Sequence, residues 1–324
     1  MHTPSRLAAA IVMAAVLAGC ASASSTSSTS TSTSATASPA SAASAAAFPA
    51  TVKAANGTVT ISAEPKRIVS LSPTSTEDLY AVGAGGQVVA VDQDSNYPAG
   101  VPKTSLSGLT PNIEAIAKYN PDLVITYQNV GGLVSGLTKL GVPVLVEPAA
   151  TTLDGAYAEI EQIGQATGHA AQADSVVAGM KRQIAADVAS AGTGHKGLTY
   201  YFEVSANPYY SVTSTTFIGQ VIDLFGLKDI ADAANKAADG GYPQLSEEYI
   251  VAARPQIIFL ADNQPSDGGQ TPAIVAKRPG WQLIPAVKDG EVIALNDDIA
   301  SRWGPRLPQL VAEIAQAVKR LPKP

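Results

Sequence analysis

The chain alternates between short apolar runs and amphipathic segments of helical period. The longest amphipathic segment is 169–190, where apolar residues recur at steps of three and four, so one face is apolar. These positions are Ala173, Val176, Val177, Met180, Ile184 and Val188. At about 1.5 Å per residue, the segment is a helix of roughly 30 Å. Strands and helices alternate on both sides of it, which predicts two lobes joined by one long helix.

In the predicted first lobe, 51–150, short apolar runs alternate with helical segments. Asn56-Gly57 between two alternating runs predicts a type I′ hairpin. Thr74 and Glu77 predict a capping box for a helix that ends near Gly83. We expect strands at 67–71, 88–91, 123–126 and 142–146, and helices at 111–119 and 133–140. This alternation predicts a mostly parallel sheet with helices on both faces.

The remainder divides into connecting helices, 151–192, and a second α/β lobe, 193–324. Thr151 and Asp154 predict a second capping box, which opens a helix that ends at Gly168. In the second lobe we expect strands at 198–204, 256–260 and 291–295, and helices at 216–225, 246–253 and 307–320.

The two lobes contain a similar helix-proline-strand unit, and aligning Pro121 with Pro255 brings the two units into register. The matched pairs are Glu114 with Glu248, Ile116 with Ile250, and Leu123-Val124 with Ile257-Ile258. Two such units also arise by chance, but the order of elements around the long helix favours two related lobes.

The N-terminus has the pattern of an export signal. Arg6 precedes an apolar run that is short for a membrane span. The run ends in Leu17-Ala18-Gly19-Cys20, which resembles a bacterial lipobox, although an ordinary signal peptide remains the alternative. We therefore expect a signal peptide at 1–19 and lipidation of Cys20. Residues 20–50, almost all Ala, Ser and Thr, predict a disordered tether, and the protein would be lipid-anchored on the extracytoplasmic face of the cell membrane.

Composition excludes several classes of function. The formal net charge of −6 and the absence of a basic patch argue against nucleic acid as a partner. The single Cys excludes an internal disulfide, and the three His residues show no metal-ligand spacing. No G-x-S-x-G motif is present, so we expect no catalytic residues and no enzyme activity.

Five phrases in order resemble the ferric-siderophore and vitamin B12 substrate-binding proteins of ABC importers. They are RIVSLSPTSTEDLYAVGAGGQVVAVD, NPDLVIT, SVTSTTFIGQVIDLFGLKDIA, ARPQIIFLAD and RPGWQLIPAVKDGEVIALNDDIASRWGPRL, within 67–324. The resemblance implies the class III substrate-binding fold, in which two Rossmann-like α/β lobes are joined by a single long helix. It also implies an ABC permease and its ATPase as partners. We expect a monomer.

The binding site should lie beyond the carboxyl ends of the strands, where open α/β sheets bind ligands. The loops expected there are rich in aromatic side chains, which suit a large, partly polar ligand. Local packing of these side chains is the alternative, and for Arg302 and Trp303 it would be a packed corner before the last helix. The candidate ligand-binding residues are Thr74, Tyr97, Tyr127, Asn129, Tyr209, Tyr210, Tyr242, Arg302 and Trp303.

The same loops contain few cations, which disfavours trianionic catecholates. By resemblance, haem binding would need a Tyr where Gly108-Leu109 stands. We therefore expect a neutral, hydroxamate-like ferric siderophore, and a cobalamin-type corrinoid is the alternative. In either case the metal belongs to the ligand, and no cofactor or metal site of the protein is expected. An envelope scaffold that has lost transport is the alternative of another class.

Permease docking in this family uses an acidic residue on each lobe. The one on the first lobe would fall near Gly131-Gly132, where no acidic residue stands. Asp267 is a weak candidate for the second lobe.

Overall fold

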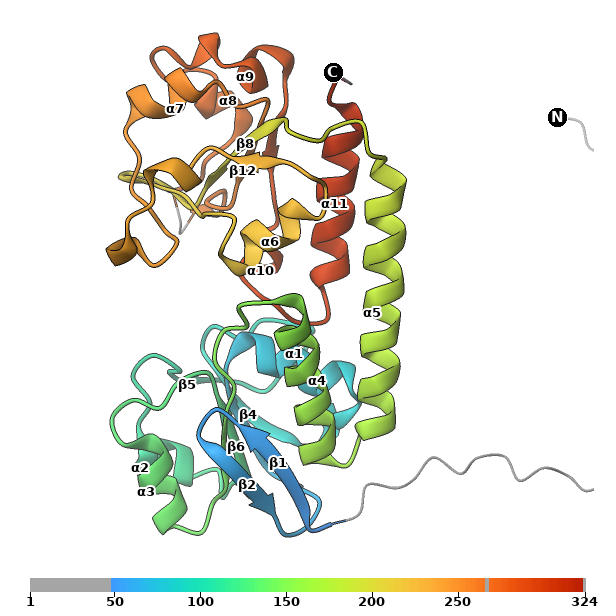
Figure 1. Ribbon diagram of the computed structural model, residues 1–324. Helices are drawn as coiled ribbons and strands as arrows, with labels where there is room; N and C mark the ends of the chain where they lie inside the picture. The colour runs from blue at the N-terminus through green and yellow to red at the C-terminus, as the bar shows by residue number, and fades with distance from the viewer. Residues whose placement is uncertain (1–47, 266–267, 323–324) are drawn as a thin grey trace, which may run out of the picture. The chain divides into compact units, whose positions relative to one another are not determined.

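The computed structural model describes residues 48–265 and 268–322. Within them, two separate sheets form an N-terminal and a C-terminal lobe, and the 22-residue helix α5 (Ala170–Ala191) connects them (Figure 1). This confirms the predicted fold class. The predicted signal peptide, the lipidation site Cys20, most of the tether and the docking candidate Asp267 lie outside the described residues. No helix in the described ranges is long and apolar enough to cross a membrane.

The N-terminal lobe is built on a five-stranded parallel sheet of order β5-β4-β3-β6-β7. Its strands are β3 (Ile68–Leu71), β4 (Val88–Asp92), β5 (Lys103–Leu106), β6 (Leu123–Thr126) and β7 (Val144–Val146). The associated helices are α1 (Pro73–Ala81), the 3₁₀ helix η1 (Ala84–Gln87), α2 (Ile113–Ala117), α3 (Leu133–Lys139) and α4 (Leu153–Thr167). Strand β5 has no apolar run and was not expected; only Leu106 of its four residues is buried.

An N-terminal hairpin joins β1 (Ala50–Ala54) to β2 (Gly57–Ile61). The expected type I′ turn on Asn56-Gly57 is wrong, because Ala54 pairs with Gly57 and the turn is centred on Ala55-Asn56. Asn56 does not adopt the positive φ that a type I′ turn needs. Instead its side chain donates to the Val144 carbonyl (2.9 Å) and accepts from the Val146 amide (3.1 Å), which covers the edge strand β7.

Two helix starts differ from the expected capping boxes. The N-cap of α1 is Ser72, whose hydroxyl accepts from the Ser75 amide, and Pro73 occupies the first turn. The N-cap of α4 is Thr152 rather than Thr151, and its hydroxyl accepts from the Gly155 amide. Glu77 therefore does not cap α1; it is buried and takes part in the ion pairs of the site described below.

The C-terminal lobe has a four-stranded parallel sheet of order β11-β8-β12-β13. Its strands are β8 (Thr199–Glu203), β11 (Lys228–Asp229), β12 (Ile257–Leu260) and β13 (Val292–Ala294), with a small hairpin of β9 (Ser205–Ala206) and β10 (Tyr209–Tyr210). Its helices are α6 (Phe217–Asp223), α7 (Glu247–Ala253), α8 (Pro272–Val275), α9 (Pro285–Asp289), α10 (Asp297–Ala300), α11 (Leu307–Arg320) and the 3₁₀ helices η2 (Asp232–Ala234), η3 (Ala237–Asp239) and η5 (Trp281–Leu283).

The predicted repeat is present in the backbone. Asn120 (φ 46°) and Arg254 (φ 52°) directly precede the two aligned prolines, and in the described ranges they are the non-glycine residues with positive φ. The helix before each begins at a matched N-cap, Asn112 for α2 and Ser246 for α7, and Ile116 and Ile250 are both fully buried. The shared strand order β4-β3-β6-β7 and β11-β8-β12-β13 supports two related lobes.

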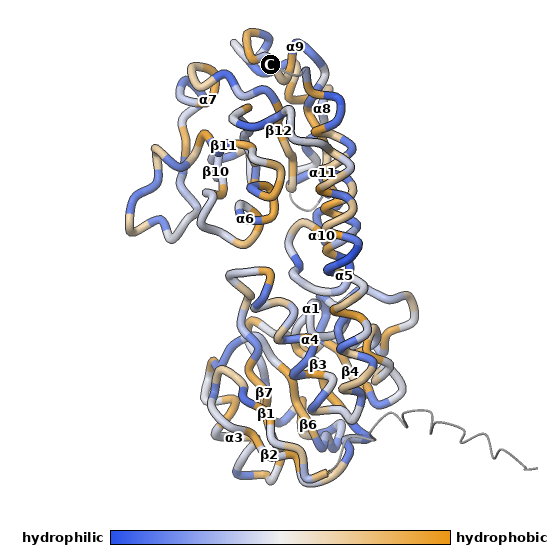
Figure 2. The backbone as a smooth tube through the Cα atoms, turned by 45° about the vertical axis from the view of Figure 1, so that its right-hand side comes forward, coloured by the Kyte–Doolittle hydropathy of each residue, from blue (hydrophilic) through white to orange (hydrophobic). Residues whose placement is uncertain are grey.

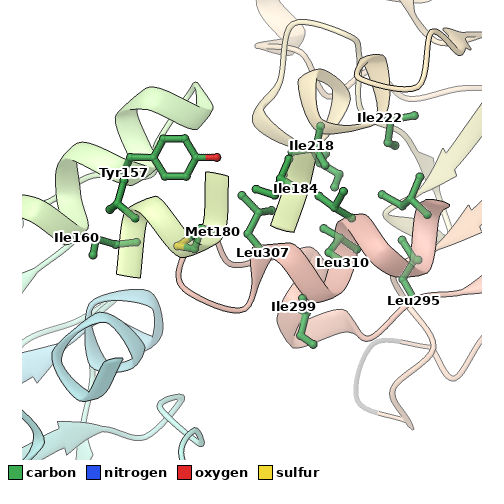
Figure 3. Packing of buried hydrophobic residues seen from close by; sticks show 14 of the residues in the cluster. Tyr157, Ile160, Met180, Ile184, Ile218, Ile222, Leu295, Ile299, Leu307 and Leu310 are labelled. Carbon is green, nitrogen blue, oxygen red and sulfur yellow. The ribbon is translucent and has the colours of Figure 1, made fainter. Parts of the chain in front are cut away.

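The apolar face of the long helix belongs to a hydrophobic core that includes residues of both lobes. Ala173, Val177, Met180 and Ile184 are buried, and Val176 and Val188 are partly buried against the same cluster, as the apolar pattern predicts. In Figure 3, Met180 and Ile184 of α5 lie beside Leu307 and Leu310 of α11, with Ile160 of α4 toward one lobe and Ile222 of α6 toward the other. Figure 2 shows the apolar central strands, such as β6, inside more polar surroundings.

Candidate ligand-binding site

Two hollows lie beyond the carboxyl ends of the strands, where parallel sheets bind ligands. The N-lobe hollow has a volume of about 580 Å³ and the C-lobe hollow about 240 Å³. Ser301, Arg302 and Trp303, between α10 and α11, line both hollows. We call residues 301–306 the strap, because this segment is shared by the two parts of one cleft.

The N-lobe hollow is lined by hydroxyl groups and carboxylates. Thr74 follows β3, Asp92 ends β4 and Tyr127 follows β6, so three strands deliver side chains to one place. Asp94 lies in the next loop and lines the same hollow. Burial raises the pKa of Asp92, while its hydrogen bonds from Ser95 act in the opposite direction. The remaining lining residues are Ser72, Pro73, Gly108 and Leu109.

The C-lobe hollow is mostly apolar. Phe202 and Val204 belong to the end of β8, Phe217 and Ile218 to the first turn of α6, and Tyr242 brings one phenol to the rim. The other lining residues outside the strap are Ala149, Ala150, Val212, Ala261 and Ala300. Such a surface favours a flat apolar face of a ligand.

The terminal guanidinium nitrogens of Arg302 and the indole N–H of Trp303 are engaged by protein groups. Arg302 donates to Glu77 (2.7 Å), Asn96 (2.8 Å), Asp298 (2.8 Å) and the carbonyl of Asp94 (3.3 Å). Trp303 donates its indole N–H to Glu159 of α4 at 2.6 Å. Both side chains line the cleft, as predicted, but they are also the packed corner that the sequence left as an alternative. Ligand contact by Arg302 and Trp303 stays a prediction.

Glu77 is the centre of the contact between the strap and the N-terminal lobe. Its carboxylate accepts two bonds from Arg306 (2.6 and 2.7 Å) and one from Arg302, and 3% of Glu77 is exposed. These are charge-assisted bonds between largely buried groups. Arg306 also lies over the ring of Tyr97, with 4.3 Å between the guanidinium carbon and the ring centroid.

Three further carboxylates are buried beside this contact without a cation of their own. Burial, then repulsion by Glu159, raises the pKa of Glu147 to about 8. Burial raises the pKa of Glu159 to about 7, and the hydrogen bond from Trp303 opposes the rise. The pKa of Asp78 is held well above its usual range by burial and by Glu159, Glu77 and Glu147. The raised pKa values favour the protonated forms of these three carboxyl groups at the junction with the strap.

Four candidate residues line neither hollow. Tyr97 packs on Arg306 on another face of α1, and the Asn129 side chain accepts from the Val134 amide at the start of α3. Tyr209 packs against Trp281, with ring centroids 5.7 Å apart, and Tyr210 is exposed on the β9–β10 hairpin. Their roles as ligand contacts stay predictions without support from the cleft geometry.

The sequence interpretation also missed residues that the fold brings into the cleft. Asp92 and Asp94 belong to a loop that the sequence places at the site, but only its aromatic residue, Tyr97, was chosen as a candidate ligand-binding residue. Phe202 and Phe217 were assigned to the interior of a strand and a helix. Phe202 lies near the end of β8 and Phe217 at the start of α6, and these positions at element ends could have identified them as cleft residues. In the described ranges, no group of three or more His, Cys, Asp or Glu is arranged to hold a metal ion.

Comparison with known proteins assigns the class. The model of the periplasmic binding protein family matches residues 68–299, so the chain belongs to this family. It is 34% identical over 281 residues to an uncharacterized ABC transporter substrate-binding lipoprotein of Bacillus subtilis, covering 84% of this chain and 86% of that one. It is 31% identical to a cobalamin-binding protein of Halobacterium salinarum, covering 84% and 74% respectively.

Among solved structures, the vitamin B12-binding protein of Vibrio cholerae superposes with a TM-score of 0.63 at 26% identity. The match covers 78% of this chain and 96% of that one. The protein is therefore a substrate-binding protein of an ABC importer, and not an enzyme.

Proposed function

We propose that the protein captures a corrinoid of the cobalamin class in the cleft and delivers it to an ABC permease. One observation carries this choice: the cleft offers hydrogen-bond acceptors, while the terminal guanidinium nitrogens of Arg302 and the indole N–H of Trp303 are engaged. Arg302 and Trp303 are bonded to protein carboxylates, whereas Asp92 and Asp94 line the N-lobe hollow. A corrinoid carries peripheral amide groups that donate to such acceptors, and the flat apolar part of the ligand suits the C-lobe hollow.

The names of two relatives support the same choice. The relative from Halobacterium salinarum is called a cobalamin-binding protein, and one from Vibrio parahaemolyticus, 28% identical over 271 residues, is called a vitamin B12-binding protein. This moves the preference away from the ferric hydroxamate expected from the sequence alone. The oxygens around a hydroxamate-bound iron are acceptors, and the engaged donors of the strap do not meet them.

A neutral or cationic ferric hydroxamate is the second candidate. The observation in its favour is the charge of the cleft: Arg302 is the cation that lines the two hollows, and it is ion-paired. Because this cation is already ion-paired, the cleft disfavours a trianionic catecholate, and neutral and cationic chelates remain as candidates. The iron or cobalt belongs to the ligand in either case.

The protein works as a lipid-anchored monomer on the extracytoplasmic face in this proposal. Cys20 after an apolar leader motivates the anchor. Cys20→Ser should release the protein from the membrane fraction or leave its precursor unprocessed. Unchanged membrane attachment with an unchanged mature mass would remove the anchor from the proposal.

Ligand titration tests the substrate. Purified protein is titrated with cyanocobalamin, ferrioxamine, ferric enterobactin and haem, and heat of binding is measured for each. We expect cyanocobalamin to bind most tightly. Tight binding of ferrioxamine alone would replace the corrinoid by the hydroxamate, and preference for ferric enterobactin would contradict the charge argument. Binding of none of these chelates would favour the envelope scaffold.

A further inference from the structure

Two carboxylates in the N-lobe hollow have capacity for a partner that the protein does not supply. Asp92 is 1% exposed, and its Oδ1 accepts from the amide (3.1 Å) and hydroxyl (2.5 Å) of Ser95. Its Oδ2 accepts no hydrogen bond from residues 48–265 or 268–322. The Asp94 side chain likewise makes no hydrogen bond or ion pair within those ranges. Both residues line the hollow.

The lining cation, Arg302, attracts Asp92 and acts to lower its pKa, but no side-chain hydrogen bond or ion pair joins Arg302 to Asp92 or Asp94 in residues 48–265 and 268–322. Arg302 is the lining residue that carries positive charge, but its guanidinium is bonded to Glu77, Asp298 and Asn96. It reaches Asp94 only through the backbone carbonyl. Asp92 is buried and Asp94 is exposed, and both carboxylates can accept hydrogen bonds, so this wall favours a ligand that brings donors.

The backbone beside Asp92 is shaped for close approach. A Cβ atom on Gly108 would lie 2.3 Å from the Leu71 carbonyl oxygen and 3.2 Å from Asp92 Oδ2. It would also lie 3.1 Å from the Tyr127 ring. Only glycine fits there, so the close approach is that of the Gly108 backbone to the Leu71 carbonyl, the Tyr127 ring and Asp92 Oδ2, and it holds Asp92 in place at the wall of the hollow.

We propose that Asp92 and Asp94 determine ligand choice by accepting hydrogen bonds from N–H donors on the rim of the chelate. The C-lobe hollow, walled by Phe202, Phe217 and Val204, receives the apolar part of the ligand. The ligand therefore enters in one orientation, with its donor-bearing rim toward the N-terminal lobe. This inference rests on the proposed function and adds which ligand groups are recognised.

The chemistry makes a sharp distinction between an amide and an acid on the ligand. A carboxylate is an acceptor only, so it binds a primary amide and repels a second carboxylate. Replacing one rim amide of cyanocobalamin by a carboxylic acid changes few atoms, but it turns an attractive hydrogen bond with the protein carboxylate into a repulsion between two negative charges. Converting the terminal ammonium of ferrioxamine B to an N-acetyl group similarly removes a cationic donor.

The experiment compares these ligand pairs on wild-type protein, on Asp92→Asn/Asp94→Asn and on Asp174→Asn. The first pair is cyanocobalamin and each of its separated propionate monoacids; the second is ferrioxamine B and its N-acetyl derivative. Asp174 is exposed on α5 and makes no side-chain contact that we observe, so it controls for net charge. Binding is measured by calorimetry, and thermal melting checks that each variant is folded.

On wild-type protein we expect at least one monoacid to bind about tenfold or more weakly than cyanocobalamin. The ratio of the dissociation constants of the monoacid and cyanocobalamin should fall toward one in the double variant, because Asn is uncharged. This ratio should stay unchanged in Asp174→Asn. Equal binding of cyanocobalamin and all its monoacids by wild type would overturn this inference and leave the corrinoid function intact.

If cyanocobalamin does not bind but ferrioxamine B does, the proposed function falls and the second ligand pair decides the inference. Preference for ferrioxamine B over its N-acetyl derivative, lost in the double variant, would support the carboxylate role. Equal binding of this pair would overturn it, as would binding of none of these ligands. Because wild-type protein is compared across ligand pairs, the inference stays testable if the double variant fails to fold.

Discussion

The two lobes share a scaffold but place different types of residue along the cleft. Their sheets repeat one strand order, and Asn120 and Arg254 adopt the same left-handed conformation before matched prolines. Yet the N-lobe hollow is lined by carboxylates and hydroxyls, while the C-lobe hollow is lined by aromatic and aliphatic side chains. Strand register and helix packing constrain the scaffold, whereas loop residues beyond the strand ends are free to differ. A repeated fold therefore need not give a symmetric binding site.

The lobes also differ in how they neutralise buried charge. In the C-terminal lobe, Glu203 and Arg278 form a bidentate ion pair (2.6 and 2.7 Å) within the lobe. In the N-terminal lobe, Glu77 receives its cations from the strap, and Asp78, Glu147 and Glu159 lie nearby with raised pKa values. In the proposed function, ligand contact and lobe stability are therefore linked at the strap.

Glu77→Gln should have the largest effect. It leaves Arg302 and Arg306, which are 9% and 12% exposed in their side chains, without their carboxylate. We expect the free energy of unfolding to fall by about 3–5 kcal/mol, measured by urea denaturation, and ligand affinity to fall because Arg302 lines both hollows.

Glu203→Gln is the matched change in the C-terminal lobe. It should cost a similar free energy of unfolding but have a smaller effect on affinity, because Arg278 lines neither hollow. Equal losses of affinity in the two variants would contradict the special role of the strap. A loss below 1 kcal/mol for Glu77→Gln would show that its ion pairs are replaceable by water.

The raised pKa of a buried carboxyl group predicts how the free energy of unfolding changes with pH. Because the pKa of Glu147 rises from 4.5 to about 8 on folding, the folded state holds a proton that the unfolded chain releases. The stabilisation is present below pH 4.5 and is lost as the pH rises to about 8. At about 1.4 kcal/mol per pH unit, we expect a decrease of up to ~3 kcal/mol between pH 5 and 8, measured by denaturant unfolding.

Glu147→Gln should flatten this decrease and be more stable than wild type at pH 8. Glu161→Gln, an exposed position on α4, is the matched control and should retain the wild-type slope. If both variants show the wild-type slope, another group carries the pH dependence. Glu159, whose pKa is raised to about 7, would then be the next residue to substitute.

The two tryptophans separate binding from folding. Trp303 lines both hollows, whereas Trp281 is fully buried in the C-terminal lobe. We expect Trp303→Ala to weaken ligand binding by about 2 kcal/mol, roughly 30-fold, measured by calorimetry. Trp281→Phe should lower the melting temperature and leave affinity unchanged. Unaltered binding in Trp303→Ala would remove this residue from the site.

The left-handed residues before the two prolines give the smallest effect. Arg254→Gly relieves a side chain in the left-handed region, and glycine's extra flexibility in the unfolded chain offsets part of the gain. We expect a gain in unfolding free energy of up to about 1 kcal/mol. Asn120→Gly should be nearly neutral, because Asn tolerates this conformation. A larger gain at Asn120 would show that the two positions are not equivalent in energy.

Much of the scaffold was predictable because its signals are local. The apolar period at Ala173, Val177, Met180 and Ile184 predicted α5, and the apolar runs predicted the inner strands. Short edge elements such as β5 and β11 were missed, because pairing with a neighbouring strand defines them rather than an apolar run. Capping was misplaced by one or two residues, since several hydroxyl residues stand together at each helix start.

The sequence by itself determined the class of fold and the long connecting helix. Hydrophobic periodicity and strand order depend on nearby residues, so they can be read along the chain. Only the tertiary structure decided that Arg302 and Trp303 are bonded to Glu77 and Glu159, more than 140 positions away in sequence. It also decided that Asp92 remains with an open acceptor. Which polar groups satisfy one another depends on distances across the lobes, and the linear order of residues does not contain those distances.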